Sequence, residues 1–287
     1  MKHIFKIYHP AVVFLYIMTA LIFTMITQNP VCIAVSFLAA SGYSIYLNGT
    51  KRYLKTLRFV AVLIIVICIM NPLFNHNGTT ILFYLFGNPI TLETCLFGIS
   101  SAGMLSSILV WFTCYNAIMP NEKFLFLFGR VMPTIALMLS MILRLVPVTR
   151  YKIRCINNAS RALGIKAKSK RQRIAHGVRS SSILLSWMME DSIETAESMN
   201  ARGYGSAKRT SFIEYKWTAH DIISLIVIAL LCAATVYMMI AQFSQFKYYP
   251  KINGDLFSPV SILGYAVYAA LLCFPLILEL REKIRWR

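Results

Sequence analysis

Two arginines in the polar middle of the sequence each stand shortly before a glycine, Arg161 in SRALG and Arg202 in ARGYG. Glycine commonly ends a helix because it adopts the left-handed backbone conformation without strain. An arginine in the last turn is favoured by the helix dipole, and its guanidinium offers a planar, permanently charged fork to carboxylates or backbone carbonyls. The pattern predicts two exposed helix tips, which either bind a partner or are two ordinary helix-terminal arginines. The tip residues are Ser160, Arg161, Ala162 and Gly164 in the first, and Ala201, Arg202, Gly203 and Gly205 in the second.

A run of acids precedes the second tip. Glu190, Glu194 and Glu197 follow i, i+4, i+7 spacing, which places them on one face of a helix. We expect this helix to begin near residues 180–182, whose serines are good N-caps, and to support the second tip. Residues 150–173 contain basic side chains and no acid. The acidic face is therefore expected to meet the end of this basic segment, which is also suited to anionic lipid headgroups.

The sequence offers few other groups for catalysis or ligand binding. Glu93 is the only acid before residue 119, but Thr91 can cap a helix whose first turn carries Glu93, which favours a structural role. The seven cysteines show no C-x-x-C spacing, and His76 and His176 have no second ligand at metal spacing, so neither a metal nor another cofactor is expected. No G-x-x-x-x-G-K-[ST] motif is present, so we expect no P-loop ATP site and no enzymatic activity.

Composition indicates the environment of these helices. Apolar residues make up 57% of the 287, and the mean hydropathy is +0.62, values typical of an integral membrane protein. The formal net charge of +18 is gathered at residues 51–58, 150–173 and 281–287 rather than spread over a face for nucleic acid, so no nucleic-acid partner is expected. Basic groups beside membrane spans mark the cytoplasmic side. We therefore expect the middle segment and the C-terminus in the cytoplasm, and residues 248–255 outside.

Seven long apolar segments are candidates for membrane helices. They cover residues 11–27, 31–47, 59–74, 92–119, 124–146, 222–243 and 260–278. Three of them lie between the first two basic groups, and an odd number of crossings cannot return the chain to the same side. We expect the segment 124–146 to be broken near Gly129, Arg130 and Pro133. The apolar run at residues 81–86 is too short to cross as a helix and predicts a hairpin or re-entrant piece.

The fold class that follows is an all-α polytopic membrane protein. It has about six to seven transmembrane or partly membrane-embedded helices, and further helices in the cytoplasm. We divide the chain into a transmembrane region at residues 1–148 with the hairpin or re-entrant piece near 75–91, polar helices at 149–218, and a transmembrane pair with a basic tail at 219–287. The first apolar segment is taken as a retained span; a signal peptide is the alternative, but no clear cleavage site follows it.

The order of the motifs resembles the transmembrane T component of energy-coupling factor (ECF) transporters, the EcfT/CbiQ family. The likeness rests on LRLVP, then NNASRALG, then an acidic helix that ends in ESMNARGYG, and it is strongest over residues 133–205. This family carries two x-Arg-x motifs at the ends of cytoplasmic coupling helices. The first motif here departs from the pattern, because no glycine follows Ser160-Arg161-Ala162 directly.

The resemblance implies a non-catalytic scaffold of an ABC-type importer in the plasma membrane. Each arginine tip would dock on one of two ATP-hydrolysing subunits, and a separate substrate-binding S component in the membrane would recognise a vitamin or metal ion. A self-sufficient secondary transporter and an intramembrane enzyme are the alternatives. The first would usually show broken repeat halves and the second converging catalytic groups, and we identify neither pattern in the sequence.

Overall fold

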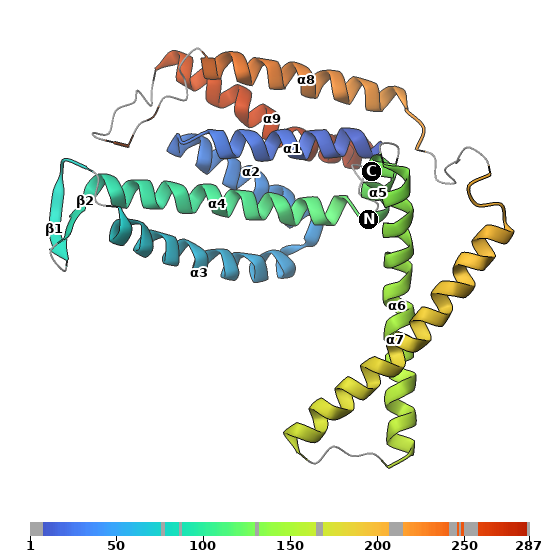
Figure 1. Cartoon of the computed structure of the whole chain (residues 1–287). Coiled ribbons are helices and arrows are strands. Elements are labelled where there is room, and N and C mark those ends of the chain that lie inside the picture. The colour runs from blue at the N-terminus through green and yellow to red at the C-terminus, as the bar shows by residue number, and fades with distance from the viewer. Residues whose placement is uncertain are drawn as a thin grey trace. The chain divides into compact units, whose positions relative to one another are not determined.

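The computed structural model describes residues 8–75, 78–85, 88–129, 132–164, 169–206, 215–240, 246, 248–249 and 258–285. These residues form helices throughout, apart from one two-stranded hairpin and short connections (Figure 1). The chain divides into two compact units. The first combines Met1–Phe124 with Tyr215–Arg287, and the second is Leu125–Glu214.

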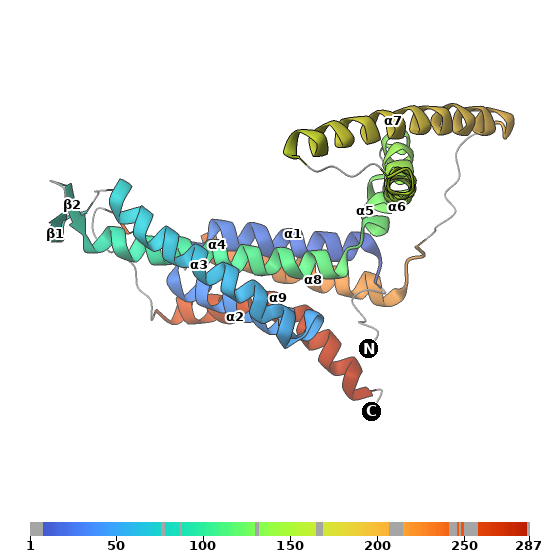
Figure 2. The ribbon, with the colours of Figure 1, turned by 90° about the horizontal axis from the view of Figure 1, so that it is seen from below.

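The first unit is a bundle of six helices. They are α1 (Pro10–Ile26), α2 (Pro30–Asn48), α3 (Thr50–Phe74), α4 (Leu92–Ile118), α8 (Ala219–Ile240) and α9 (Pro259–Arg285). Helix α4 packs against α1, α2 and α3, while α2 also contacts α9, and α8 lies against α9 and α1. Figure 2 shows these helices running side by side as a bundle. The two ends of the sequence therefore contribute to one core.

Local chemistry explains where the first two helices begin. Pro30 stands at the first helical position of α2, and the side chain of Asn29 accepts a hydrogen bond from the backbone amide of Val31 (3.0 Å). Proline suits this position because its φ is already helical and its missing amide has no partner to lose. Helix α1 begins in the same way, with Pro10 at its start and the His9 ring nitrogen Nδ1 accepting from Ala11.

Large aromatic side chains and small hydroxyls fill the core of the bundle. Tyr16, Trp111 and Tyr268 are fully buried. The indole of Trp111 donates to the Ser36 hydroxyl (3.3 Å), which is also hydrogen-bonded to Thr24 (2.9 Å). Small polar residues of this kind let apolar helices approach closely and join them by hydrogen bonds where lipid supplies none.

The second unit contains two long helices, α6 (Pro133–Ala162) and α7 (Lys170–Ala201), and α5 (Asn121–Gly129) lies at the boundary between the units. The apolar segment at 124–146 is thus divided between two helices that end and begin at Gly129 and Pro133. Helix α6 continues through Pro147. The start expected for α7 at residues 180–182 was wrong, because the helix begins at least ten residues earlier, at Lys170. Ser169 precedes it instead, and its backbone amide donates to the Gln172 side chain (3.3 Å).

Six helices are long and apolar enough to cross a membrane: α2, α3, α4, α6, α8 and residues 259–281 of α9. Helix α1 is shorter at 17 residues, but much of it is buried in the bundle. These helices define an all-α, multi-pass membrane protein. Helix α6 differs from the other five because none of its most apolar stretch is buried in the described structure.

Candidate functional site

The first arginine tip is the end of α6. Arg161 is exposed in the last helical turn, and the amide of Gly164 donates to the Arg161 carbonyl (3.0 Å). Gly164 adopts a φ of 71°, in the left-handed region, and a methyl group at this position would contact nothing within 4 Å. Ala162 is also exposed and Ser160 is half-buried. Among the described residues, the tip therefore exposes the Arg161 side chain and leaves open space beside Gly164.

The second tip, at the end of α7, is more completely built. Arg202 is itself the C-cap, and Gly203 follows with a φ of 77°. The amide of Gly203 donates to the Asn200 carbonyl (2.9 Å) and that of Tyr204 donates to the Met199 carbonyl (3.0 Å). This pair of bonds is a Schellman motif, which ends a helix and reverses the chain. Ala201, Arg202, Gly203 and Gly205 are all exposed, and the φ of Gly205 is 93°.

The two tips are not brought together. Figure 1 shows α6 and α7 crossing, so that the end of each helix projects away from the crossing in its own direction. Each tip therefore presents its own surface. The arginine also differs in position, since Arg161 precedes the C-cap Leu163 by two residues whereas Arg202 occupies the C-cap.

The acidic face of α7 differs from the prediction. Glu190, Glu194 and Glu197 are exposed, and none of them forms an ion pair with a base of the described chain. The acid that does so is Asp191, which pairs with Lys152 of α6. The reason is rotation about the helix axis, because the crossing with α6 falls on the adjacent face of α7 and leaves the three glutamates on the outside.

Glu93 has a structural role, as the capping pattern favoured. It is 2% exposed at the start of α4 and accepts hydrogen bonds from the Thr80 amide (3.2 Å) and the Thr79 hydroxyl (3.2 Å). These bonds hold the hairpin of β1 (Ile81–Leu85) and β2 (Asn88–Thr91), which is antiparallel and pairs Ile81 with Thr91. Its carboxylate oxygens thus accept hydrogen bonds from the loop that leads into the hairpin.

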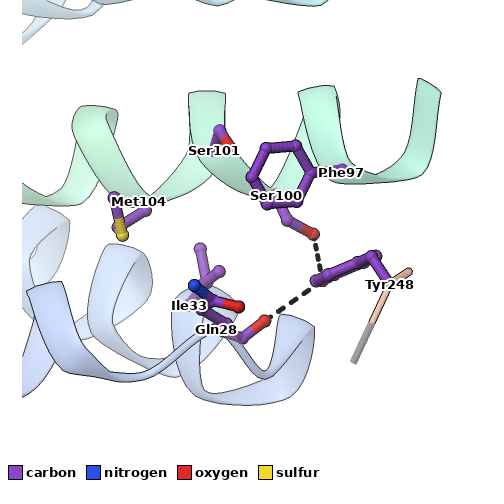
Figure 3. A pocket seen from close by; sticks show the side chains of 7 residues that line it. All are labelled: Gln28, Ile33, Phe97, Ser100, Ser101, Met104 and Tyr248. Carbon is purple, nitrogen blue, oxygen red and sulfur yellow. Dashed lines mark hydrogen bonds between the residues drawn. The ribbon is translucent and has the colours of Figure 1, made fainter. Parts of the chain in front are cut away.

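A small cavity of about 60 Å³ lies between α2, α4 and Tyr248, enough for a water molecule or two. Figure 3 shows the Tyr248 hydroxyl between Ser100 and the backbone oxygen of Gln28, to which it donates (3.1 Å). Tyr248 is only 4% exposed, and burial raises the pKa of its hydroxyl. Tyr248 therefore closes one end of the bundle.

Sequence reasoning missed a polar cluster around the buried carboxylate of Asp221, where the chain re-enters the bundle before α8. Asp221 accepts from the amide and hydroxyl of Thr218 (2.9 and 2.7 Å) and from the backbone amide of His9 (2.9 Å). The ring of His9 stacks on Trp217 at 4.1 Å between centroids. The spacing T-x-x-D is a capping-box signal that marks the start of α8. Nothing in the local sequence indicates His9 as the third partner.

The described residues contain no group of three or more histidine, cysteine, aspartate or glutamate side chains that could hold a metal ion. His176 lies instead beside the hydroxyl of Ser180 (3.4 Å), and His76 falls outside the described residues. No protein-family model and no curated protein matches the chain. The fold and the site thus define a multi-pass helical membrane protein that presents two exposed arginine tips.

Proposed function

We propose that this chain is the energy-coupling scaffold of an ECF-type ABC importer. Two ABC-type ATPase subunits bind the second unit, one at the Arg161 tip and one at the Arg202 tip. A substrate-binding S component packs on the six-helix bundle and carries a vitamin or a metal ion. The observation that carries the proposal is that α6 and α7 both end in a glycine-terminated turn that exposes an arginine.

The bundle supports a definite membrane arrangement. If α1, α2, α3, α4, α8 and α9 each cross once, the number of crossings is even, and the basic groups at 51–58 and 281–287 fall on one side. Residues 150–173 lie on that side as well if α6 does not cross, which agrees with the assignment of α6 to the second unit rather than to the bundle. Two crossings, α3 and α4, then separate the basic groups at 51–58 and 150–173, in place of the three apolar segments counted in the sequence. In this arrangement the N-terminus, the second unit and the C-terminus are cytoplasmic in the plasma membrane.

The hairpin and the connection between α8 and α9 support the same orientation. Tyr248, from that connection, bonds to Ser100 and packs against Phe97 near the start of α4 (5.6 Å between ring centroids). The hairpin adjoins the same start of α4 through Glu93. Tyr248 and the hairpin therefore lie at one end of the bundle, which we assign to the outside.

Energy coupling in this scheme needs no catalytic group in the chain. Opening and closing of the ATPase pair moves the two tips, and rigid-body motion of the helices reorients the S component. An arginine fork suits such a joint because it makes several directed hydrogen bonds to carboxylates or carbonyls at once. The exposed basic residues at 150–173 also favour contact with anionic lipid at the membrane surface.

Affinity purification of the tagged chain from its native membrane tests the proposal. We expect two ATP-hydrolysing subunits in stoichiometric amounts and a further small membrane protein. Their absence under conditions that preserve membrane complexes would contradict the proposal. Solute transport by the purified chain alone in liposomes would instead support a secondary transporter.

A further inference from the structure

Lys152 is an unusual residue in the middle of α6. It is 7% exposed, whereas the bases on either side of it, Arg150 and Arg154, are exposed. Its ammonium group forms an ion pair with Asp191 of α7 and stands 4.3 Å from the centre of the Trp187 ring. Burying a lysine costs free energy unless the charge has partners, so the two contacts account for its position.

The contact between α6 and α7 is narrow, and Lys152 lies within it. Lys152 and Ile156 are the only described residues of α6 that are buried, and no described residue of α7 is. One turn before Lys152, the Thr149 hydroxyl lies 3.7 Å from the sulfur of Met188. Among the described contacts, Lys152 and Asp191 thus form the one ion pair that joins the two helices.

The partners of Lys152 restrict rotation as well as separation. Asp191 and Trp187 are four residues apart and therefore share a face of α7, so the ammonium group meets both only when that face is turned toward α6. Apolar contacts between two helices tolerate more sliding, because they have no preferred direction. Because the buried ammonium group of Lys152 contacts both side chains, it sets the point at which α7 crosses α6 and the rotation of α7 about its own axis.

The distance from this crossing to each tip is similar. Arg161 is nine residues beyond Lys152, about 14 Å at the rise of an α-helix, and Arg202 is eleven residues beyond Asp191, about 16 Å. A shift or rotation at the crossing is carried to both tips by rigid helices of these lengths. The separation of the tips therefore depends on the clamp formed by Lys152, Asp191 and Trp187.

We infer that Lys152 is a positioning residue that clamps α6 to α7 and sets the separation of the two arginine tips. The clamp itself is a property of the second unit; its consequence for ATPase binding rests on the proposed function. Two ATPases that move against each other need tips held at a defined spacing. Without the clamp, α6 and α7 slide or rotate against each other where they cross, and movement of one tip is not transmitted to the other.

Distance measurements between the tips test the clamp. Nitroxide labels at Asn158 and Ser198, both exposed and close to the tips, are introduced into a variant whose seven native cysteines are replaced, in nanodiscs of zwitterionic and anionic lipid. Double electron–electron resonance then gives the distribution of distances. We expect Lys152→Met to broaden this distribution and shift its mean, and Asp191→Asn to do so in the same direction.

Matched variants distinguish loss of the clamp from a general effect of substitution on the protein. Arg154→Met removes an exposed charge two residues away and should leave the distribution unchanged. Lys152→Arg keeps a cation over Trp187, and the exchange Lys152→Asp with Asp191→Lys restores opposite charges, so both should recover a narrower distribution than Lys152→Met. Recovery by the exchange also shows that the broadening follows from loss of the ion pair rather than from a change of side chain at either position.

The outcomes distinguish the clamp from the proposed function. An unchanged distribution in Lys152→Met overturns the clamp, whatever the ATPases do. A changed distribution with no loss of ATPase subunits or of their hydrolysis in the purified complex leaves the clamp standing and removes its link to energy coupling. A changed distribution with loss of coupling supports both.

Discussion

The backbone amide of His9 donates a hydrogen bond to the carboxylate of Asp221 (2.9 Å), 212 residues further along the chain. The bond joins the start of α1 to the start of α8, where the chain returns to the bundle after the second unit. The stacked rings of His9 and Trp217 lie beside it. One buried carboxylate thus closes the bundle at the point where its two sequence halves meet.

Replacing Asp221 by asparagine is expected to destabilise the bundle. Asparagine keeps one acceptor oxygen and places an NH2 group where the other carboxylate oxygen now accepts, either from the His9 amide or from the amide and hydroxyl of Thr218. Leaving a buried donor unpaired costs about 1 to 3 kcal/mol. The measurement is the thermal unfolding midpoint of the protein in detergent. His220→Gln, an exposed change in the same turn, is the control. Equal unfolding midpoints for the two variants would show that the hydrogen bonds of Asp221 do not stabilise the bundle.

Gly78 is expected to tolerate no side chain. Its φ is 151°, and an added Cβ would stand 2.5 Å from the Thr91 hydroxyl and 2.7 Å from a Glu93 carboxylate oxygen. Gly78→Ala should therefore lower stability by more than about 1 kcal/mol. Gly177 lies in α7 with open space around it, so Gly177→Ala should be neutral or gain about 0.5 to 1 kcal/mol from the better helix former. Thermal unfolding compares the pair, and a loss of stability in both would contradict the argument.

The arginine tips are expected to carry ATPase binding. Truncating an arginine in a buried, hydrogen-bonded contact costs roughly 2 to 5 kcal/mol of binding free energy. Arg202→Ala should therefore reduce the co-purified ATPase, the double change with Arg161→Ala should reduce it further, and Arg202→Lys should recover part of it. Membrane insertion should stay normal in all three. Normal assembly and transport in the double alanine variant would make the tips ordinary helix ends.

Membrane orientation is open to a direct test. Single cysteines placed in residues 51–58 and at exposed positions of 150–173 should resist an impermeant thiol reagent in intact cells, whereas cysteines at 250–255 should react. Permeabilised cells provide the control, because every exposed position should then be labelled. Preferential labelling of residues 150–173 from outside would reverse the orientation and remove the site from the compartment where ATP is hydrolysed.

ATP hydrolysis is expected only in the complex. The sequence lacks a P-loop motif, so the purified chain should show no specific ATPase activity, and activity should appear when the partner subunits are present. The assay follows phosphate release with and without the co-purified subunits. Robust hydrolysis by the chain alone, after contaminating ATPases are excluded, would overturn the assignment of the activity to partners.

The sequence by itself determined the features that depend on neighbours along the chain. The long apolar runs indicated a multi-pass helical protein, because length and hydropathy alone decide whether a helix suits a bilayer. The glycines at 164 and 203 indicated where α6 and α7 end, because the hydrogen bonds that end a helix join residues only three to five positions apart. Glu93 was identified as a first-turn residue for the same reason.

Only the tertiary structure decided which polar side chains are buried and with what. Lys152 is one base among many in its segment, and its burial depends on Asp191, 39 residues away on another helix. Asp221 was recognisable as part of a cap but not as a partner of His9, and nothing near Tyr248 in the sequence indicated its contact with Ser100. Such partners are chosen by how helices cross and rotate against one another. That choice follows from the packing of the whole chain, which no local pattern of residues records.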